Sequence, residues 1–169
     1  MAKTSIKCVI LDTSFLVALT IDSRPNHEVA VRYFQYWVEN GIQMYVPTVV
    51  YAEYLVHNEG IPNYILRRVK IKSFGIDDAE IAARIQRERV IVRGDEDLSK
   101  VVFKDDIKII GTACAVAAKA IAHDDPATMS RYIKNAAARV AAAKDMQSIC
   151  LYDGFNRGLA DMSDPDLGI

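Results

Sequence analysis

The stretch Ile6-Lys-Cys-Val-Ile-Leu-Asp12-Thr13-Ser14 sets the fold class of this chain. Residues 6–11 form a short apolar run rich in β-branched side chains, which predicts a buried parallel strand, and helical character follows over 14–21. Similar segments predict further strands at 42–46, 71–74 and 148–151. Helices are predicted at 26–39, from Thr48, and at 61–70, 77–90, 106–121 and 126–144. Strands that alternate with helices predict an α/β fold with a central, mainly parallel sheet.

The bulk composition restricts the classes of protein to consider. The chain has 169 residues, which predicts one domain over 1–169. Its 21 basic and 22 acidic residues nearly balance, which excludes a strongly basic nucleic-acid coat protein. No apolar run approaches the roughly 18 to 20 residues that span a bilayer, and the N-terminus lacks the features of a secretory signal. Cys8, Cys114 and Cys150 lie among apolar neighbours, so we expect buried thiols and a cytoplasmic protein.

Four acids are candidates for a site, although each also has an ordinary structural explanation. Asp12 follows the first strand, and it could equally cap the helix over 14–21. Glu53 interrupts an almost wholly apolar helix, where a glutamate is seldom buried without a partner or a metal; the alternative is an exposed helix position. Asp106 begins the helix over 106–121, and either it or the adjacent Asp105 could be the cap. Asp153 follows the last strand, where it could be a simple turn residue.

The four acids together predict a metal site. Parallel sheets place their sites beyond the carboxyl ends of the strands, and both the first and the last predicted strand deliver an acid there. Four carboxylates at one edge repel each other and need cations to remain charged. Oxygen ligands suit Mg²⁺ or Mn²⁺, which lower the pKa of a bound water and stabilise charge during phosphodiester cleavage. Hydrolysis of a nucleic acid is therefore the predicted chemistry.

The ordered motifs make the chain resemble the PIN-domain superfamily. The family opens with a strand followed by Asp-Thr/Ser-Ser/Asn, matched by residues 9–14, and it continues with a glutamate on the helix after the second strand, matched by residues 46–53. The third acid begins a helix as Asp-x-x-Ile-x-x-Thr-Ala, and the matching residues are Asp106, Ile109, Thr112 and Ala113. The final acid follows the fourth strand, and the matching residue is Asp153, with Phe155 nearby.

The resemblance implies a three-layer α/β/α PIN-like fold and an Mg²⁺- or Mn²⁺-dependent endoribonuclease that acts on single-stranded or looped RNA. The implied catalytic and metal-binding residues are Asp12, Glu53, Asp106 and Asp153. The implied supporting residues are Ser14, Thr112 and Asp105, with Thr112 expected beside Asp106, where it would orient a water or a carboxylate. Many members resemble toxin ribonucleases of toxin–antitoxin pairs, which a small antitoxin protein inhibits, and homodimers are frequent.

The chain departs from the family pattern in two places. Leu151 stands where the family usually has a threonine, two residues before the last acid. The segment 107–152 between the last two acids is also longer than in the compact toxins, mainly because of the helix predicted over 126–144. This extra helix, inserted before the last strand, could be a packing element, a dimer surface or a lid.

Two clusters of cations could contact RNA phosphates, or they could be solvated helix faces. Arg67 and Arg68 begin a basic run, and Lys104 and Lys108 flank Asp106. The histidines are expected at the surface; they are His27, His57 and His123. The main alternative function is a catalytically inactive PIN-like RNA-binding or assembly module. An aspartyl phosphotransfer domain is less favoured, because the second aspartate of its Asp-x-Asp motif is replaced by serine at position 14.

Overall fold

The computed structural model describes residues 7–88 and 100–162, with the side chains of 100–104 excepted. Strands and helices alternate along most of the chain. In order, the elements are β1 (Cys8–Leu11), α1 (Thr13–Thr20), α2 (His27–Glu39), β2 (Gln43–Pro47), α3 (Thr48–His57), α4 (Asn63–Leu66), β3 (Val69–Lys72), α5 (Ile76–Arg87), α6 (Lys100–Ala115), β4 (Ala120–His123), α7 (Met129–Arg139), the 3-10 turn η1 (Ala141–Ala143), β5 (Gln147–Cys150), the 3-10 turn η2 (Leu151–Asp153) and α8 (Arg157–Ala160).

The strands form one parallel sheet in the order β3-β2-β1-β4-β5. Every residue of β1 and β4 is buried, as expected for central strands that are covered on both faces. The chain builds the sheet outward from β1 in one direction and from β4 in the other. The register pairs Leu11 with Ala122 and His123 with Cys150, so β1, β4 and β5 end side by side.

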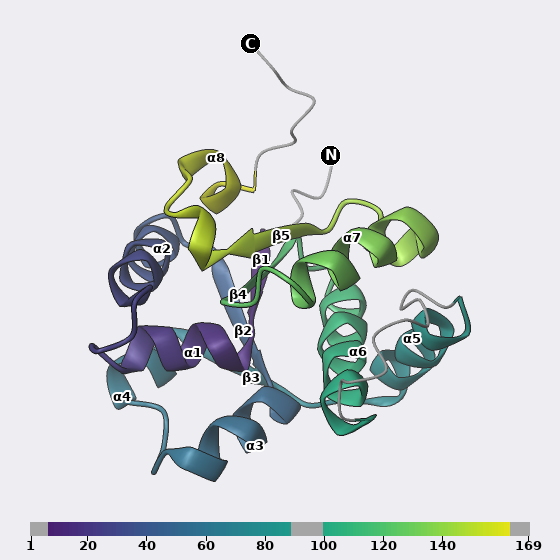
Figure 1. The fold of residues 1–169 in the computed structure, drawn as a ribbon, viewed down its shortest axis with the longest axis horizontal. Helices are drawn as coiled ribbons and strands as arrows, with labels where there is room; N and C mark the ends of the chain where they lie inside the picture. The colour runs from purple at the N-terminus through teal and green to yellow at the C-terminus, as the bar shows by residue number, and fades with distance from the viewer. Residues whose placement is uncertain (1–6, 89–99, 163–169) are drawn as a thin grey trace.

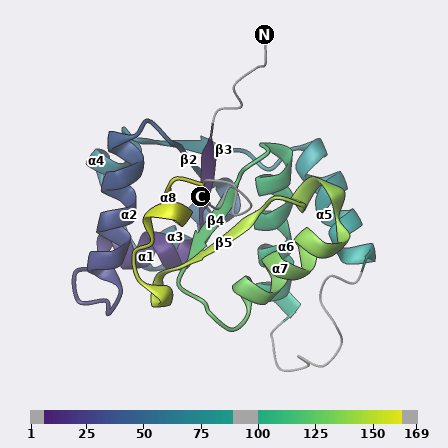
Figure 2. The same cartoon turned by 90° about the horizontal axis from the view of Figure 1, so that it is seen from above.

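Helices cover both faces of the sheet, which gives the predicted three-layer α/β/α architecture. In Figure 1, α1, α2 and α4 lie on one side of the strands, and α5, α6 and α7 lie on the other. Figure 2 shows the same separation from above. α3 contacts both α1 and α6, and it begins directly where β2 ends, so it lies near the carboxyl edge. Within the described part of the chain, no helix combines the length and apolar character needed to cross a membrane.

The core on the α2 side is built around Trp37. Its ring centroid lies 5.6 Å from that of Phe15 on α1 and 5.4 Å from that of Tyr33 on α2. Its indole N–H donates to the carbonyl of Ala160 at 3.0 Å, which fastens α8 to the same core. The thiols of Cys8, Cys114 and Cys150 are buried and free, as predicted.

The helix predicted over 106–121 is wrong at both ends. α6 begins at Lys100, so Asp106 lies inside the helix, and α6 ends at Ala115. Ala117 then adopts a φ of 52°, and the segment Ala120–His123 forms the buried strand β4. A short alanine-rich run suits a buried helix and a buried strand equally well. Pairing with β1 and β5 makes it a strand.

Smaller differences occur elsewhere. The helix predicted over 61–70 is reduced to α4, because Val69 pairs with Met44 of β2 and opens β3 two residues earlier than predicted. The extra helix predicted over 126–144 is present between β4 and β5 as the shorter α7. The last two residues of the helix predicted over 77–90 lie outside the described residues.

Candidate active site

A cleft of about 520 Å³ opens at the carboxyl edge of the sheet. It includes the residues that directly follow β1 and β4, where the sheet reverses its direction of growth; open α/β sheets bind ligands at such a switch point. Most of its charged residues are acidic. The lining residues are Asp12, Thr13, Ser14, Val17, Ala18, Arg24, Glu53, Asp106, Asp124, Asp125, Met129 and Tyr152.

Asp12 both caps α1 and lines the cleft. The helix cap and the position in the candidate site are therefore compatible. One of its carboxylate oxygens, Oδ2, accepts from the backbone N–H of Ser14 at 3.2 Å and from the Ser14 hydroxyl at 2.6 Å. The side chain is almost wholly buried, with 8% of the residue exposed. Burial raises the pKa of Asp12, whereas the hydrogen bonds from Ser14 and Thr13 oppose that rise. Ser14 therefore takes the supporting position that the sequence predicts.

Glu53 extends from α3 into the same cleft and is half-buried. Its Oε2 accepts a short hydrogen bond from the hydroxyl of Thr13, which ties α3 to the start of α1. Burial is the main reason that the pKa of Glu53 is raised, and the charges of Asp12 and Asp105 raise it further. Asp105 in turn accepts from the ammonium of Lys108 at 2.6 Å, so this lysine is paired with an acid.

Asp106, not Asp105, is the residue of this pair that lines the cleft. Burial raises the pKa of Asp106 to about 7, and the negative charges of Asp12, Asp125 and Glu53 contribute. Asp12 and Glu53 line the same cleft as Asp106. The predicted convergence therefore occurs for three of the four predicted acids.

Asp125 lines the cleft and was not predicted as a site residue. It follows β4 in the loop that leads to α7, and its charge raises the pKa of both Asp12 and Asp106. Its Oδ1 also accepts from the backbone N–H groups of Ala127 and Thr128, which fixes the turn that precedes α7. The available signal was an acid that follows the apolar segment 120–122, but that segment was assigned to a helix.

Asp153, the fourth predicted acid, lies away from the other three. It is exposed in η2, after β5, and it is not among the residues that line the cleft. Phe155, matched to the family's phenylalanine, packs against Tyr33 with ring centroids 4.9 Å apart. Because the helix predicted over 106–121 overlaps β4, the last acid was expected after β5.

His123 is fully buried, contrary to the expected surface position. Its Nδ1 accepts from the backbone N–H of Asp125 at 3.1 Å, so in the neutral ring the proton is on Nε2, which donates to the hydroxyl of Ser148 at 2.7 Å. Burial lowers the pKa of His123 to about 4, which keeps the ring neutral at ordinary pH. The histidine thus helps to fix the backbone that carries Asp125.

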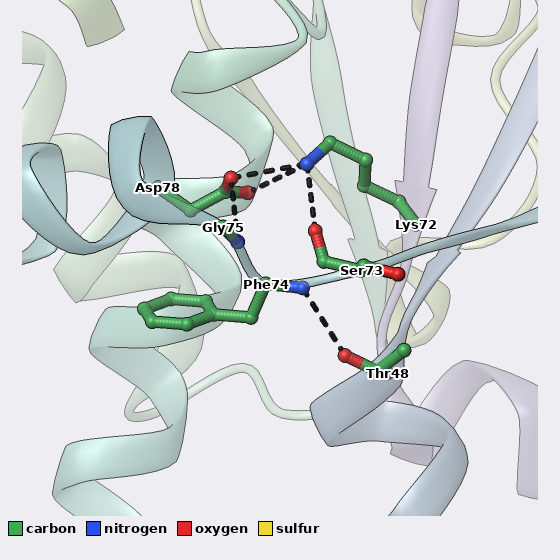
Figure 3. Close-up of polar contacts among 6 residues, drawn as sticks. All are labelled: Thr48, Lys72, Ser73, Phe74, Gly75 and Asp78. Atoms are coloured by element: carbon green, nitrogen blue, oxygen red, sulfur yellow. Dashed lines mark hydrogen bonds and ion pairs between the residues drawn. The ribbon is translucent and has the colours of Figure 1, made fainter.

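A polar cluster at the end of β3 and the start of α5 (Figure 3) lies at the contact between α5 and α6, the helix that carries Asp106. The Lys72 ammonium contacts both carboxylate oxygens of Asp78, at 3.0 and 3.2 Å, and Asp78 also accepts from the backbone N–H of Gly75. This contact holds the pKa of Asp78 below its usual value despite burial, and the hydroxyl of Thr112 contributes to that lowering. Thr112 is buried near Asp78 at the α5–α6 contact and is not among the residues that line the cleft with Asp106.

The predicted basic residues lie mostly away from the cleft. Arg67 and Arg68 directly precede β3, which places them at the opposite, amino edge of the parallel sheet. They line a separate cavity of about 570 Å³ together with Tyr64. The side chain of Lys104 lies outside the described residues. Arg24, which was not predicted, is the only cation among the described residues that line the acidic cleft.

The donor set of the cleft fits a hydrated divalent cation. Within the described residues, no three acid, histidine or cysteine side chains lie close enough to hold one ion by themselves. Mg²⁺, however, usually keeps several waters and binds proteins through only one or two carboxylates. The lining offers carboxylate oxygens and no thiol or imidazole, which suits Mg²⁺ or Mn²⁺ rather than a softer metal.

No protein-family model and no curated protein sequence matches this chain. Two solved structures are similar. The first is VapBC2 from Rickettsia felis bound to a DNA fragment from its promoter, with a TM-score of 0.57 and 16% identity over 83% of this chain and 98% of that chain. The second is VapC20 from Mycobacterium tuberculosis, a toxin that cleaves the sarcin–ricin loop, with a TM-score of 0.50 and 17% identity over 72% of this chain and 92% of that chain. These likenesses confirm the predicted PIN-like α/β/α fold.

Proposed function

We propose that this protein is an Mg²⁺- or Mn²⁺-dependent endoribonuclease whose working acids are Asp12, Glu53, Asp106 and Asp125. The observation that supports the proposal is the convergence of these acids, from four elements, in one cleft at the switch point of a PIN-like sheet. Asp125 replaces Asp153 in the proposed set, because it follows the strand beside β1 and acts on the charge state of Asp12 and Asp106.

Each acid has a distinct task in this proposal. Asp12 and Glu53 are held in place by hydroxyl donors, from Ser14 and Thr13, so their remaining lone pairs can face a cation. Asp106 depends strongly on a counter-charge, because burial and the charges of its neighbours raise its pKa to about 7. A bound divalent ion supplies a water of lowered pKa and stabilises the charge that develops on the phosphate.

The proposed substrate is single-stranded or looped RNA. The likeness to VapC20, which cleaves an RNA loop, supports this class of substrate. The likeness to VapBC2 supports a small antitoxin-like inhibitor as partner. A homodimer and a cytoplasmic location are retained as predictions from the resemblance.

The direct test is cleavage of a labelled single-stranded RNA by the full-length protein with Mg²⁺, Mn²⁺ or EDTA. Cleavage should require the metal and should fall by at least about 100-fold in Asp106→Asn, because metal-site and charge-stabilising groups typically contribute several kcal/mol. The exposed Asp145→Asn serves as a matched control and should cleave at the wild-type rate.

Two results would contradict the proposal in different ways. Cleavage that persists in EDTA, or in Asp106→Asn, would refute the metal mechanism. Absence of cleavage together with an unchanged melting temperature in Mn²⁺ would favour the inactive RNA-binding or assembly module.

A further inference from the structure

The cleft also contains one aromatic ring and one cation that have no task in the proposed hydrolysis. Tyr152 lines the cleft with 61% of the residue exposed, although its neighbour Leu151 is fully buried. Arg24 lines the same cleft from the loop between α1 and α2. An exposed aromatic ring and a guanidinium beside a phosphodiester-cleaving centre have the chemistry of a nucleotide-binding subsite.

We propose that Tyr152 and Arg24 form a positioning subsite for single-stranded RNA, in which the Tyr152 ring stacks on an unpaired base and Arg24 binds a backbone phosphate. This inference rests on the proposed ribonuclease function. It names residues that orient the substrate and that do not take part in bond cleavage.

The segment that carries Tyr152 is fixed by its neighbours. The hydroxyl of Tyr33 donates to the carbonyl of Gly154 at 3.2 Å and accepts from the backbone N–H of Asn156 at 3.0 Å. Phe155 packs against the Tyr33 ring. The backbone after Tyr152 is therefore fastened to α2, while the Tyr152 side chain remains accessible. A ring presented on a fixed backbone loses little conformational entropy when a base stacks on it.

The segment that carries Arg24 is fixed as well. The backbone N–H of Arg24 donates to the carbonyl of Ile21 at 3.0 Å, and its carbonyl accepts from His27 at 3.1 Å. Asn26 donates its side-chain N–H to Asp124 at 2.6 Å, which joins this loop to the loop after β4. These hydrogen bonds hold the backbone of Arg24 in place beside the acids.

Electrostatics gives Arg24 a specific role. A phosphate that enters this acidic cleft meets carboxylates, and among the described lining residues only Arg24 offers a fixed positive charge. Guanidinium groups bind phosphate oxygens in bidentate geometry.

The other exposed aromatic residue near arginines provides a matched control. Tyr64 is also 61% exposed and lines the cavity of Arg67 and Arg68 at the opposite edge of the sheet. Both tyrosines thus expose the same fraction of their surface, and each lines a cavity that is also lined by arginine. Only Tyr152 lies in the cleft of the acids, so the two sites predict different effects on RNA binding.

The test measures the affinity of full-length protein for a fluorescein-labelled single-stranded RNA in Mg²⁺ buffer. An Asp106→Asn background prevents the proposed cleavage. Tyr152→Ala should weaken binding about tenfold or more, because base–aromatic stacking contributes about 1 to 3 kcal/mol per base. Tyr152→Phe keeps the ring and should stay within about twofold of the parent, and Tyr64→Ala should bind like the parent. Arg24→Ala should weaken binding and reduce its salt dependence, because one phosphate contact is lost.

The outcomes separate this inference from the proposed function. Unchanged affinity in Tyr152→Ala, an equal loss in Tyr64→Ala, or no binding of single-stranded RNA would overturn the subsite. If wild type cleaves RNA but binding is independent of Tyr152, the subsite fails and the ribonuclease stands. If binding depends on Tyr152 and Arg24 but wild type cleaves nothing, the ribonuclease fails and the subsite stands.

Discussion

Replacement of Asp106 by asparagine should stabilise the metal-free protein at neutral and alkaline pH. The ordinary pKa of an aspartate is 3.8, and burial with neighbouring charge raises that of Asp106 to about 7. Between these values the folded protein binds a proton that the unfolded chain has already lost. The free energy of unfolding of the wild type therefore falls as pH rises through this range.

The size of the effect follows from the two pKa values. A tenfold change in a protonation equilibrium corresponds to about 1.4 kcal/mol, so the full difference corresponds to about 4 kcal/mol. Water in the cleft screens the charges, and we therefore expect about 2 to 4 kcal/mol above pH 7. Asp106→Asn removes the ionisable group and should be more stable than wild type by this amount, whereas the two proteins should converge near pH 4.

Urea unfolding followed by circular dichroism, from pH 4.5 to 8 in EDTA, measures this difference. The exposed Asp145→Asn should follow the wild type throughout. Mn²⁺ should stabilise the wild type at pH 8, because it binds only the folded cleft, and should stabilise Asp106→Asn less. A difference between wild type and Asp106→Asn that does not change with pH would refute the assigned repulsion.

Three further variants test the supports of the site. In Gly111→Ala the new Cβ would lie 2.8 Å from the backbone oxygen of Asp78, so thermal unfolding should show a net loss of about 1 to 2 kcal/mol even after the gain in helix propensity. Lys72→Met leaves a buried Asp78 without its cation and should cost about 2 kcal/mol in urea unfolding at pH 7, but much less in acid that protonates Asp78. Ser14→Ala removes the 2.6 Å hydrogen bond to Asp12 and should cost about 1 to 2 kcal/mol and slow RNA cleavage; a wild-type cleavage rate would count against this support.

Local sequence patterns predict well where Asp12 and Glu53 lie in the site. The strand before Asp12 is a short apolar run rich in β-branched residues, and Glu53 is an isolated charge in an apolar helix, so each acid is conspicuous against its neighbours. Their positions follow from the strand that precedes them, because parallel strands end at one edge. The structure accordingly places both in the cleft.

The positions of β4 and Asp125 depend on strand pairing, which local sequence patterns do not determine. The segment Ala120–His123 is too short and too rich in alanine to distinguish helix from strand, and its pairing with β1 and β5 decides the outcome. Asp125 therefore could not be identified from the sequence as an acid that follows a strand. The burial of His123 is likewise a consequence of β4 lying between two other strands.

The assignment of the fourth acid is tested most directly by two matched aspartate variants in the RNA-cleavage assay with Mn²⁺. Asp125 lines the acidic cleft after β4, and Asp153 is exposed after β5. Asp125→Asn should reduce the cleavage rate by at least about 100-fold, whereas Asp153→Asn should cleave within about twofold of wild type. Loss of cleavage in Asp153→Asn with full activity in Asp125→Asn would contradict the site described here.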